Sequence, residues 1–206
     1  MDERKLSLEA FSEALASASP TPGGGGAGAY AASLGAALCV MAGHFTVNKK
    51  KFAEKVPEIE AIMAEASDIS SRLTLLVEKD AEAFEPLSKA YSIPKDDPSR
   101  DEVMESCLRG AAEVPMEVLR LSARTIELHE ALLDGKVSPI IVSDVASGAV
   151  LAWSAMYASA LNVRVNTSSM KDREYAKALD SEAEKLVDAH WRTAEKIYKE
   201  VYGRFV

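Results

Sequence analysis

The longest regular pattern of apolar positions lies between residues 53 and 91. Apolar side chains recur there at alternating steps of three and four, as in Ile69, Leu73 and Leu76. That spacing places them along one side of a long helix. Asp80 is the only charged residue on this stripe, and Pro86 follows about one and a half turns later. We expect the proline to kink or end the helix and to open space beside Asp80.

Two further amphipathic segments predict long helices. One of these helices follows the polar loop 92–100, where Asp97 is the expected N-cap and Pro98 the first helical residue. We expect Pro115 to interrupt this helix and Gly135 to end it. The other covers about 172–205 and has a charged outer side. A shorter helix over about 7–18 precedes them. Strand patterns are nearly absent, and only 138–142 and 163–166 read as briefly extended.

Two segments contain almost only small apolar residues. Residues 27–47 are mostly Ala and Gly, and residues 145–163 have a similar composition. The first is long enough to cross a bilayer, but such weakly apolar residues barely offset the cost of insertion. We expect both to be central helices whose small residues let neighbouring backbones approach. The predicted fold is all-α: a single-domain helical bundle over residues 1–206, with two buried small-residue helices ringed by long amphipathic helices.

Composition narrows the classes of function. The 206 residues include 24 Lys and Arg against 32 Asp and Glu, a formal charge of -8, which argues against a general nucleic-acid binder. Cys39 and Cys107 have neither C-x-x-C nor metal-type spacing and indicate reduced thiols, not a disulfide framework. Residues 1–8 contain no apolar run typical of a signal peptide. We therefore expect a cytoplasmic protein with no membrane partner.

Four consecutive glycines are the first candidate for a ligand site. Gly23, Gly24, Gly25 and Gly26 predict a loop of close approach that leads into the first small-residue helix, whose free N–H groups could hold an anion. The loop lacks the Lys-Ser/Thr of a P-loop, and no strand precedes it, so neither standard nucleotide site is expected. A plain structural turn is the alternative.

A basic cluster follows the same helix. Lys49, Lys50 and Lys51 leave its end, and His44 lies one to two turns earlier. The cluster could hold a polyanionic ligand tail, or it could simply complement the helix dipole. The histidines are few and lie at unrelated positions, without an H-E-x-x-H pattern, so we expect no metal site.

Two carboxylates stand in unusual places. Asp80 lies within an apolar stripe, and Asp144 lies at the start of the second small-residue helix. A desolvated Asp80 would hold its proton to higher pH, as a catalytic acid must, whereas Asp144 near helix N–H groups would stay ionised. The alternative is a buried ion pair with Arg or Lys. Further polar residues flank the second small-residue helix: Ser143, Asn162, Arg164 and Asn166.

Several segments, in order, carry a resemblance to a known family. They are Pro20-Thr21-Pro22-Gly23-Gly24-Gly25-Gly26 with its following helix and Thr46-Val47-Asn48-Lys49-Lys50-Lys51-Phe52; Asp80-Ala81-Glu82-Ala83-Phe84; Ala112-Glu113-Val114-Pro115; and Ser143-Asp144-Val145 with Leu161-Asn162-Val163-Arg164-Val165-Asn166. Together they resemble the formiminotransferase-cyclodeaminase C-terminal family, which includes free-standing methenyltetrahydrofolate cyclohydrolases. Two positions depart from it: Gly26 stands where serine is usual, and Asn48 where glycine is common.

The resemblance implies an all-helical enzyme, dimeric or higher, with sites near the subunit interface. Its substrate would be a tetrahydrofolate derivative, which can be polyglutamylated, and no cofactor would be tightly bound. The glycine loop would approach the pterin or aminobenzoyl part, Lys49 to Lys51 and Arg164 would face the glutamate tail, and Asp80 would be the acid or base. No formiminotransferase domain accompanies the chain, which favours methenyltetrahydrofolate cyclohydrolase. The alternatives are a formiminotetrahydrofolate cyclodeaminase, which releases ammonia, and a non-catalytic folate-binding or scaffold protein.

Overall fold

The computed structural model describes residues 3–205, and this part of the chain is helical, with no β-strand. The α-helices are α1 (Leu8–Leu15), α2 (Gly24–Val47), α3 (Val56–Ala90), α4 (Arg100–Leu133), α5 (Val142–Ser169) and α6 (Arg173–Tyr202). Short 3-10 helices are η1 (Glu3–Lys5), η2 (Lys50–Lys55), η3 (Pro139–Ile141) and η4 (Gly203–Phe205). The predicted all-α class is confirmed.

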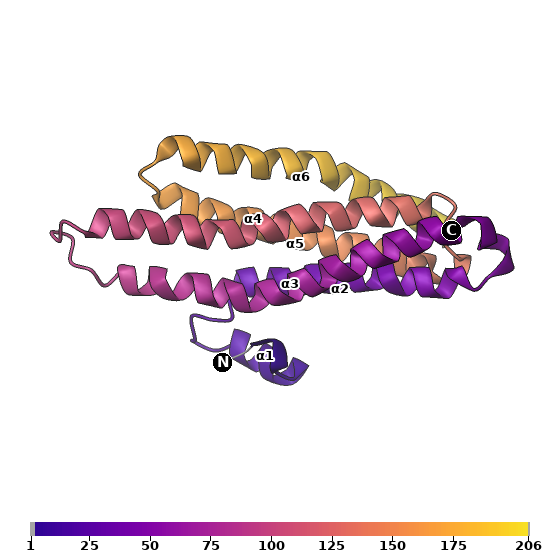
Figure 1. Cartoon of the computed structure of the whole chain (residues 1–206), viewed down its shortest axis with the longest axis horizontal. Helices are drawn as coiled ribbons and strands as arrows, with labels where there is room; N and C mark the ends of the chain where they lie inside the picture. The colour runs from indigo at the N-terminus through magenta and orange to yellow at the C-terminus, as the bar shows by residue number, and fades with distance from the viewer. Residues whose placement is uncertain (1–2, 206) are drawn as a thin grey trace.

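Helices α2 to α6 form one elongated bundle, and α1 stands off it beside α2 and α3 (Figure 1). α2 packs against α3 and α5, and α4 packs against α3, α5 and α6. The two small-residue helices, α2 and α5, therefore lie side by side in the bundle, and each keeps an outward face that the other helices leave exposed. α1 contributes no buried residue, and its main contact is the ring of Phe11, 5.6 Å from the ring of Tyr30.

α2 and α5 cross with their backbones in contact, which explains their small residues. A Cβ added to Gly35 would lie 2.8 Å from the carbonyl oxygen of Gly148. Beside this crossing, Nε2 of the fully buried His129 donates to the Gly35 carbonyl at 3.0 Å. Burial lowers the pKa of His129 to about 4, so the ring is neutral at physiological pH. Larger side chains at the crossing would force the two helices apart.

Neither internal proline breaks its helix. α3 continues through Pro86 to Ala90, and α4 continues through Pro115 to Leu133. Of the two outcomes expected at Pro86, a kink or an end of the helix, the end does not occur, and the expected interruption of α4 was wrong. A proline in a helix removes one hydrogen bond, and packing in the bundle can compensate for that loss.

Several predicted boundaries shift. α4 begins at Arg100, because Asp97 accepts a hydrogen bond from the backbone N–H of Ser99 at 2.8 Å and forms a turn instead of an N-cap. Gly135 ends α4 with φ +66°, as expected. Neither stretch that was expected to be extended is a strand. Residues 138–142 lie in η3 and at the start of α5, and residues 163–166 lie within α5. The glycine run is not a loop, since α2 starts at Gly24 and only Gly23 precedes it as the N-cap.

The difference in helix length leaves room at one end of the bundle. α2 has 24 residues, whereas α3 has 35 and α4 has 34. At about 1.5 Å per residue, α3 is roughly 16 Å longer than α2. α2 therefore begins partway along the bundle, and α3 and α4 extend beyond its start (Figure 1). The space beyond the first turn of α2 is bordered by α3, α4 and α5.

α2 and the segment 139–169 are long and apolar enough to cross a membrane by length and composition alone. About half of each apolar window is buried within the bundle, 44% and 50% respectively, as is usual for core helices. The remaining outward faces carry exposed apolar side chains, including Leu34 and Phe45 on α2 and Leu161 and Val165 on α5.

Candidate active site

The carboxylate of Asp80 lies against the first turn of α2. Its Oδ2 accepts a hydrogen bond from the backbone N–H of Gly26 at 2.9 Å. The first N–H groups of a helix have no partner within that helix. Asp80, which belongs to α3, therefore caps the start of α2 in the way that an N-cap side chain normally caps its own helix. The positive end of the helix dipole also favours its charge.

Gly25 allows the carboxylate to approach this closely. A Cβ on Gly25 would lie 2.2 Å from Oδ1 of Asp80, so any side chain there would displace the carboxylate. Gly26 is different, because a Cβ there would meet only ordinary contacts at 3.6 Å or more, with the Val77 carbonyl as the nearest atom. A Cβ at position 26 would therefore fit without moving Asp80.

Two opposing influences set the acidity of Asp80. Burial disfavours the charged form and raises its pKa, and the hydrogen bond from Gly26 lowers it by a smaller amount. The net result is a carboxyl pKa above its ordinary value of 3.8. A carboxylate with a raised pKa is a stronger base than an exposed one, and its acid form persists to higher pH.

A cavity of about 230 Å³ opens beside Asp80 and the glycines. Its walls come from segments far apart in the sequence: Pro20, Thr21, Gly23, Gly24 and Gly25 from the α2 entrance; Phe84, Leu87 and Tyr91 from α3; Ala111 and Pro115 from α4; and Asn162, Val165 and Asn166 from α5. We call this cavity the Asp80 cleft. Most of its wall is apolar, so polar groups within it interact more strongly than they would in water.

Two asparagines provide the polar side of the Asp80 cleft opposite α3. Nδ2 of Asn162 donates to the Ala158 carbonyl at 2.8 Å. Nδ2 of Asn166 donates to the Asn162 carbonyl at 2.9 Å and to the Ala111 carbonyl at 3.3 Å. Both N–H groups of the Asn166 amide are thus directed at carbonyls, which leaves its Oδ1 for a ligand, whereas Asn162 keeps one N–H as well as its Oδ1.

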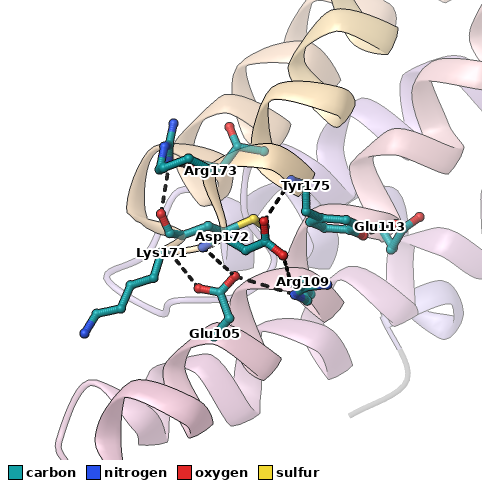
Figure 2. Close-up of polar contacts among 9 residues, drawn as sticks. Glu105, Arg109, Glu113, Lys171, Asp172, Arg173 and Tyr175 are labelled. Atoms are coloured by element: carbon teal, nitrogen blue, oxygen red, sulfur yellow. Dashed lines mark hydrogen bonds and ion pairs between the residues drawn. The ribbon is translucent and has the colours of Figure 1, made fainter.

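The α4 wall and the α5–α6 turn are fastened together beside the cleft (Figure 2). The Glu105 carboxylate accepts the backbone N–H of Lys171 at 2.7 Å and of Asp172 at 3.3 Å. Arg109 pairs with Asp172, and its guanidinium lies 4.3 Å from the centre of the Tyr175 ring. These contacts fix the last turns of α5, which carry both cleft asparagines, relative to α4.

Tyr175 completes this fastening through Glu113 (Figure 2). Its hydroxyl donates to Oε1 of Glu113 at 2.6 Å. Burial and this hydrogen bond raise the pKa of Tyr175 to about 12, so the phenol stays protonated and continues to donate.

The remaining predicted site residues lie at the opposite end of the bundle. The course of α2 from Gly26 onward separates them from Asp80 by roughly 25–35 Å within one chain. They are His44, Lys49, Lys50 and Lys51 near the end of α2, and Ser143 and Asp144 at the start of α5. Asp80 and Asp144 therefore do not share a site within one chain, and a joint role for them as acid and base stays a prediction.

The groups at this far end make surface contacts. Nζ of Lys49 donates to Oγ of Ser138 at 2.5 Å, and Nζ of Lys51 lies 5.6 Å from the ring of Phe52. Oγ of Ser143 lies 3.5 Å from Oδ2 of Asp144. Here the lysines and His44 are exposed, whereas Asp144 is half-buried, as Asp80 is.

Arg164 also lies outside the cleft. Its guanidinium pairs with Asp180 on α6, and the Asp180 carboxylate accepts a second hydrogen bond from Oγ1 of Thr167 at 2.6 Å. Asp180 is buried, so this pair satisfies a charge in the α5–α6 interface. Within this chain the Arg164 guanidinium is engaged by Asp180, and its contact with a ligand tail stays a prediction.

The sequence interpretation missed the aromatic and proline walls of the cleft. Phe84, Leu87 and Tyr91 follow Asp80 at steps of four, three and four, which places them on the same side of α3. That register was visible in the sequence and could have found them. Pro115 could be assigned only once α4 and α5 were seen side by side.

A larger hollow of about 680 Å³ adjoins the cleft on the other side of α3. Its charged lining is mainly acidic, with Glu3, Glu78, Glu82 and Glu85. Burial, and secondly the charge of Asp80, raise the pKa of Glu3. This acidic lining makes the hollow a poor place for an anionic ligand tail. Within residues 3–205, no group of three or more His, Cys, Asp or Glu is placed to hold a metal ion.

Comparisons with known proteins agree with this geometry. The family model described as formiminotransferase-cyclodeaminase matches residues 7–185. A methenyltetrahydrofolate cyclohydrolase from Methylorubrum extorquens is 32% identical over 202 residues, covering 96% of this chain and 97% of that protein. A formimidoyltransferase-cyclodeaminase from Sus scrofa is 30% identical over 146 residues, covering 68% of this chain and 27% of that protein.

A solved structure shares the whole fold. The crystal structure of formiminotetrahydrofolate cyclodeaminase from Thermotoga maritima superposes with a TM-score of 0.85 at 28% sequence identity, covering 96% of this chain and 98% of that chain. The likeness thus extends over all of the helices that build the Asp80 cleft. The family match and these relatives together show that this chain belongs to the formiminotransferase-cyclodeaminase family.

Proposed function

We propose that this protein is a methenyltetrahydrofolate cyclohydrolase, which adds water to the one-carbon bridge of methenyltetrahydrofolate and gives formyltetrahydrofolate. One observation carries the proposal: a half-buried carboxylate, Asp80, held by the Gly26 N–H in the wall of a cleft that also carries apolar side chains. The relative from Methylorubrum extorquens bears this activity in its name and matches this chain over nearly its whole length.

The size of the cleft fits one part of such a substrate. Pockets for whole drug-sized ligands measure about 300–1,000 Å³, and the Asp80 cleft measures about 230 Å³. It can therefore enclose the bridge and an adjoining ring, while the rest of the folate extends out of the cleft. The apolar side chains of Phe84, Leu87 and Tyr91 would pack against the ring.

The charge of the substrate explains the role of Asp80. The methenyl bridge is an amidinium-like cation, which a carboxylate in a poorly solvated cleft stabilises. Asp80 takes a proton from water as the water oxygen bonds to the bridge carbon, and the cation becomes a neutral hydroxylated adduct. The adduct then loses its hydroxyl proton as the C=O bond forms, and one C–N bond breaks with its electron pair and a proton going to the nitrogen. One proton is released overall, and no tightly bound cofactor takes part.

The cyclodeaminase reaction is the second candidate, because the matching Thermotoga maritima structure carries that name. There a folate nitrogen attacks the formimino carbon, and an acid protonates the departing ammonia. The raised pKa of Asp80 suits the acid as well as the base. The same cleft could therefore serve either reaction, and only substrates distinguish them.

The test mixes purified protein separately with methenyltetrahydrofolate and with formiminotetrahydrofolate and follows the methenyl absorbance. The proposal expects loss of methenyl absorbance in the first mixture to be faster than in the control without enzyme. A gain in the second mixture, with release of ammonia, would instead make the protein a cyclodeaminase. No change in either, from folded protein that binds folate, would leave a non-catalytic folate-binding protein and overturn the proposal.

We also propose that the protein is a homodimer that pairs through the outward faces of α2 and α5. Leu34 is 42% exposed and Phe45 52% on α2, and Leu161 is 69% exposed on the adjacent α5. Exposed apolar stripes on neighbouring helices are typical of an interface between subunits. Sedimentation at micromolar concentration tests this: the wild-type protein should be a dimer, and Leu34→Glu a monomer.

A two-fold dimer would also unite the two ends of the bundle. If the two-fold axis crosses α2 near its middle and at right angles to it, the two copies of α2 run antiparallel. The lysines that follow α2 in one copy then approach the Asp80 cleft of the other. They would meet the glutamate tail as it leaves the cleft, which gives Lys49, Lys50 and Lys51 a role that they cannot have within one chain.

A further inference from the structure

Pro115 stands in the middle of α4 and forms part of the wall of the Asp80 cleft. Proline has no backbone N–H, so the carbonyl four residues earlier loses its partner within the helix. In α4 that carbonyl belongs to Ala111, which is also a wall residue of the cleft. A buried carbonyl without a hydrogen bond is unfavourable, so a donor from elsewhere is expected.

The donor comes from α5. Nδ2 of Asn166 reaches the Ala111 carbonyl at 3.3 Å and the Asn162 carbonyl at 2.9 Å. Both amide hydrogens are thereby directed at carbonyls. The flipped amide would instead point Oδ1 at two carbonyl oxygens, which repel it, so the contacts fix the orientation of the amide.

We propose that Pro115 is a positioning residue: by freeing the Ala111 carbonyl, it fixes the Asn166 amide so that Oδ1 accepts a hydrogen bond from an N–H group on the bound ring. This inference rests on the proposed function for the identity of the ring. Oδ1 of Asn166 would then add a fixed acceptor to the cleft wall that also carries the Asp80 carboxylate.

The kinetic test restores the missing N–H with Pro115→Ala. The new N–H competes for the Ala111 carbonyl and releases one of the two contacts of Asn166. KM for methenyltetrahydrofolate should rise by roughly three- to tenfold, the value of one neutral hydrogen bond, with kcat within about twofold of wild type. Asn166→Ala should raise KM similarly, and the double variant should be no worse than Asn166→Ala alone.

Pro86→Ala is the matched control. Pro86 also lies inside a long helix, but it is exposed and is not part of the cleft wall. Its removal should leave KM and kcat close to wild type. Equal changes in both proline variants would mean that stiffening of the helices, and not the Ala111 carbonyl, controls binding, and would overturn the proposal. Independent effects of Pro115→Ala and Asn166→Ala on KM would overturn it as well.

A second measurement needs no folate. The side-chain amide signals of Asn166 can be identified in 15N NMR spectra by their loss in Asn166→Ala. We expect their protons to exchange slowly with water in the wild type and in Pro86→Ala, and severalfold faster in Pro115→Ala. If the wild type neither binds nor converts folate, the proposed function fails, and the NMR comparison still tests the positioning. Unchanged signals in Pro115→Ala would overturn the positioning, and altered signals with unchanged KM would overturn the ligand contact.

Discussion

The two ends of the bundle contain similar ingredients in different surroundings. At one end Asp80 lies near the start of α2, and at the other Asp144 lies in the first turn of α5. Asp80 belongs to a different helix from the N–H group it binds, so the packing of α3 on α2 encloses it in a cleft. Asp144 belongs to the helix it begins and has exposed Ser143 as its neighbour. Both carboxylates are half-buried, and what sets Asp80 apart is the backbone N–H that a second helix presents to it and the cleft beside it.

Replacing each of the two carboxylates by its amide tests the difference between the two ends of the bundle most directly. Asp80→Asn should lower kcat by roughly 10²- to 10⁴-fold, because it removes the proton acceptor. The fold should survive, since the Asn oxygen can still accept the Gly26 N–H. Asp144→Asn should leave kcat within a few-fold of wild type. The test measures the steady-state rate of methenyl hydrolysis for both variants, with circular dichroism as a check of their fold. A large decrease in kcat for Asp144→Asn alone would make Asp144, and not Asp80, the catalytic carboxylate.

A pair of neighbouring glycines sharpens the comparison at the Asp80 end. Gly25→Ala introduces a Cβ 2.2 Å from Oδ1 of Asp80 and must move the carboxylate. A displacement of about 1 Å can lower a rate on the order of 10²-fold. Gly26→Ala meets only ordinary contacts and should keep the rate, while stabilising the first turn of α2 by about 0.5–1 kcal/mol. Equal rates for the two alanine variants would show that the placement of Asp80 does not control the reaction.

The far end should affect binding and not chemistry. Changing Lys49, Lys50 and Lys51 together to alanine should raise KM for a polyglutamylated substrate by about tenfold, given roughly 0.2–1 kcal/mol for each exposed ion pair. The effect should be smaller with a monoglutamate and should weaken at high salt. Kinetics with the two substrates at two salt concentrations test this. A fall in kcat with unchanged KM would contradict a role in holding the tail.

The smallest effect concerns stability and its dependence on pH. Because the folded-state pKa of Asp80 is raised, folding favours its neutral form. That preference stabilises the wild type fully below the ordinary pKa and is lost as pH rises through the folded-state pKa. Asp80→Asn, which is always neutral, should therefore become increasingly more stable than the wild type as pH rises toward neutrality. Urea unfolding of both proteins at several pH values measures this; a gap that narrows with rising pH would mean that the pKa is lowered.

The sequence predicted most of the helices because their signals are local. The alternating steps of three and four predicted α3, and Gly135 correctly marked the end of α4. Asp80 could also be found, since a single carboxylate on a long apolar stripe is visible without a structure. The small residues of α2 and α5 predicted their close approach, which occurs at Gly35 and Gly148.

The rest depended on contacts between helices. The length and antiparallel course of α2 and α5 decide that Asp144 and the lysines lie far from Asp80, and no local pattern contains that information. Arg164 was assigned to a ligand because its partner, Asp180, lies on another helix. Pro115 was expected to interrupt α4, but Asn166 of α5 donates to the carbonyl that the proline leaves free.

The most direct test of the central claim is a crystal structure of Asp80→Asn with methenyltetrahydrofolate, since the variant should bind the substrate without converting it. We expect the bridge carbon beside residue 80, the ring against the backbone of Gly25 and Oδ1 of Asn166, and the glutamate directed out of the cleft. A bridge bound instead among His44, Ser143 and Asp144 would place the reaction at the opposite end of the bundle and contradict the account.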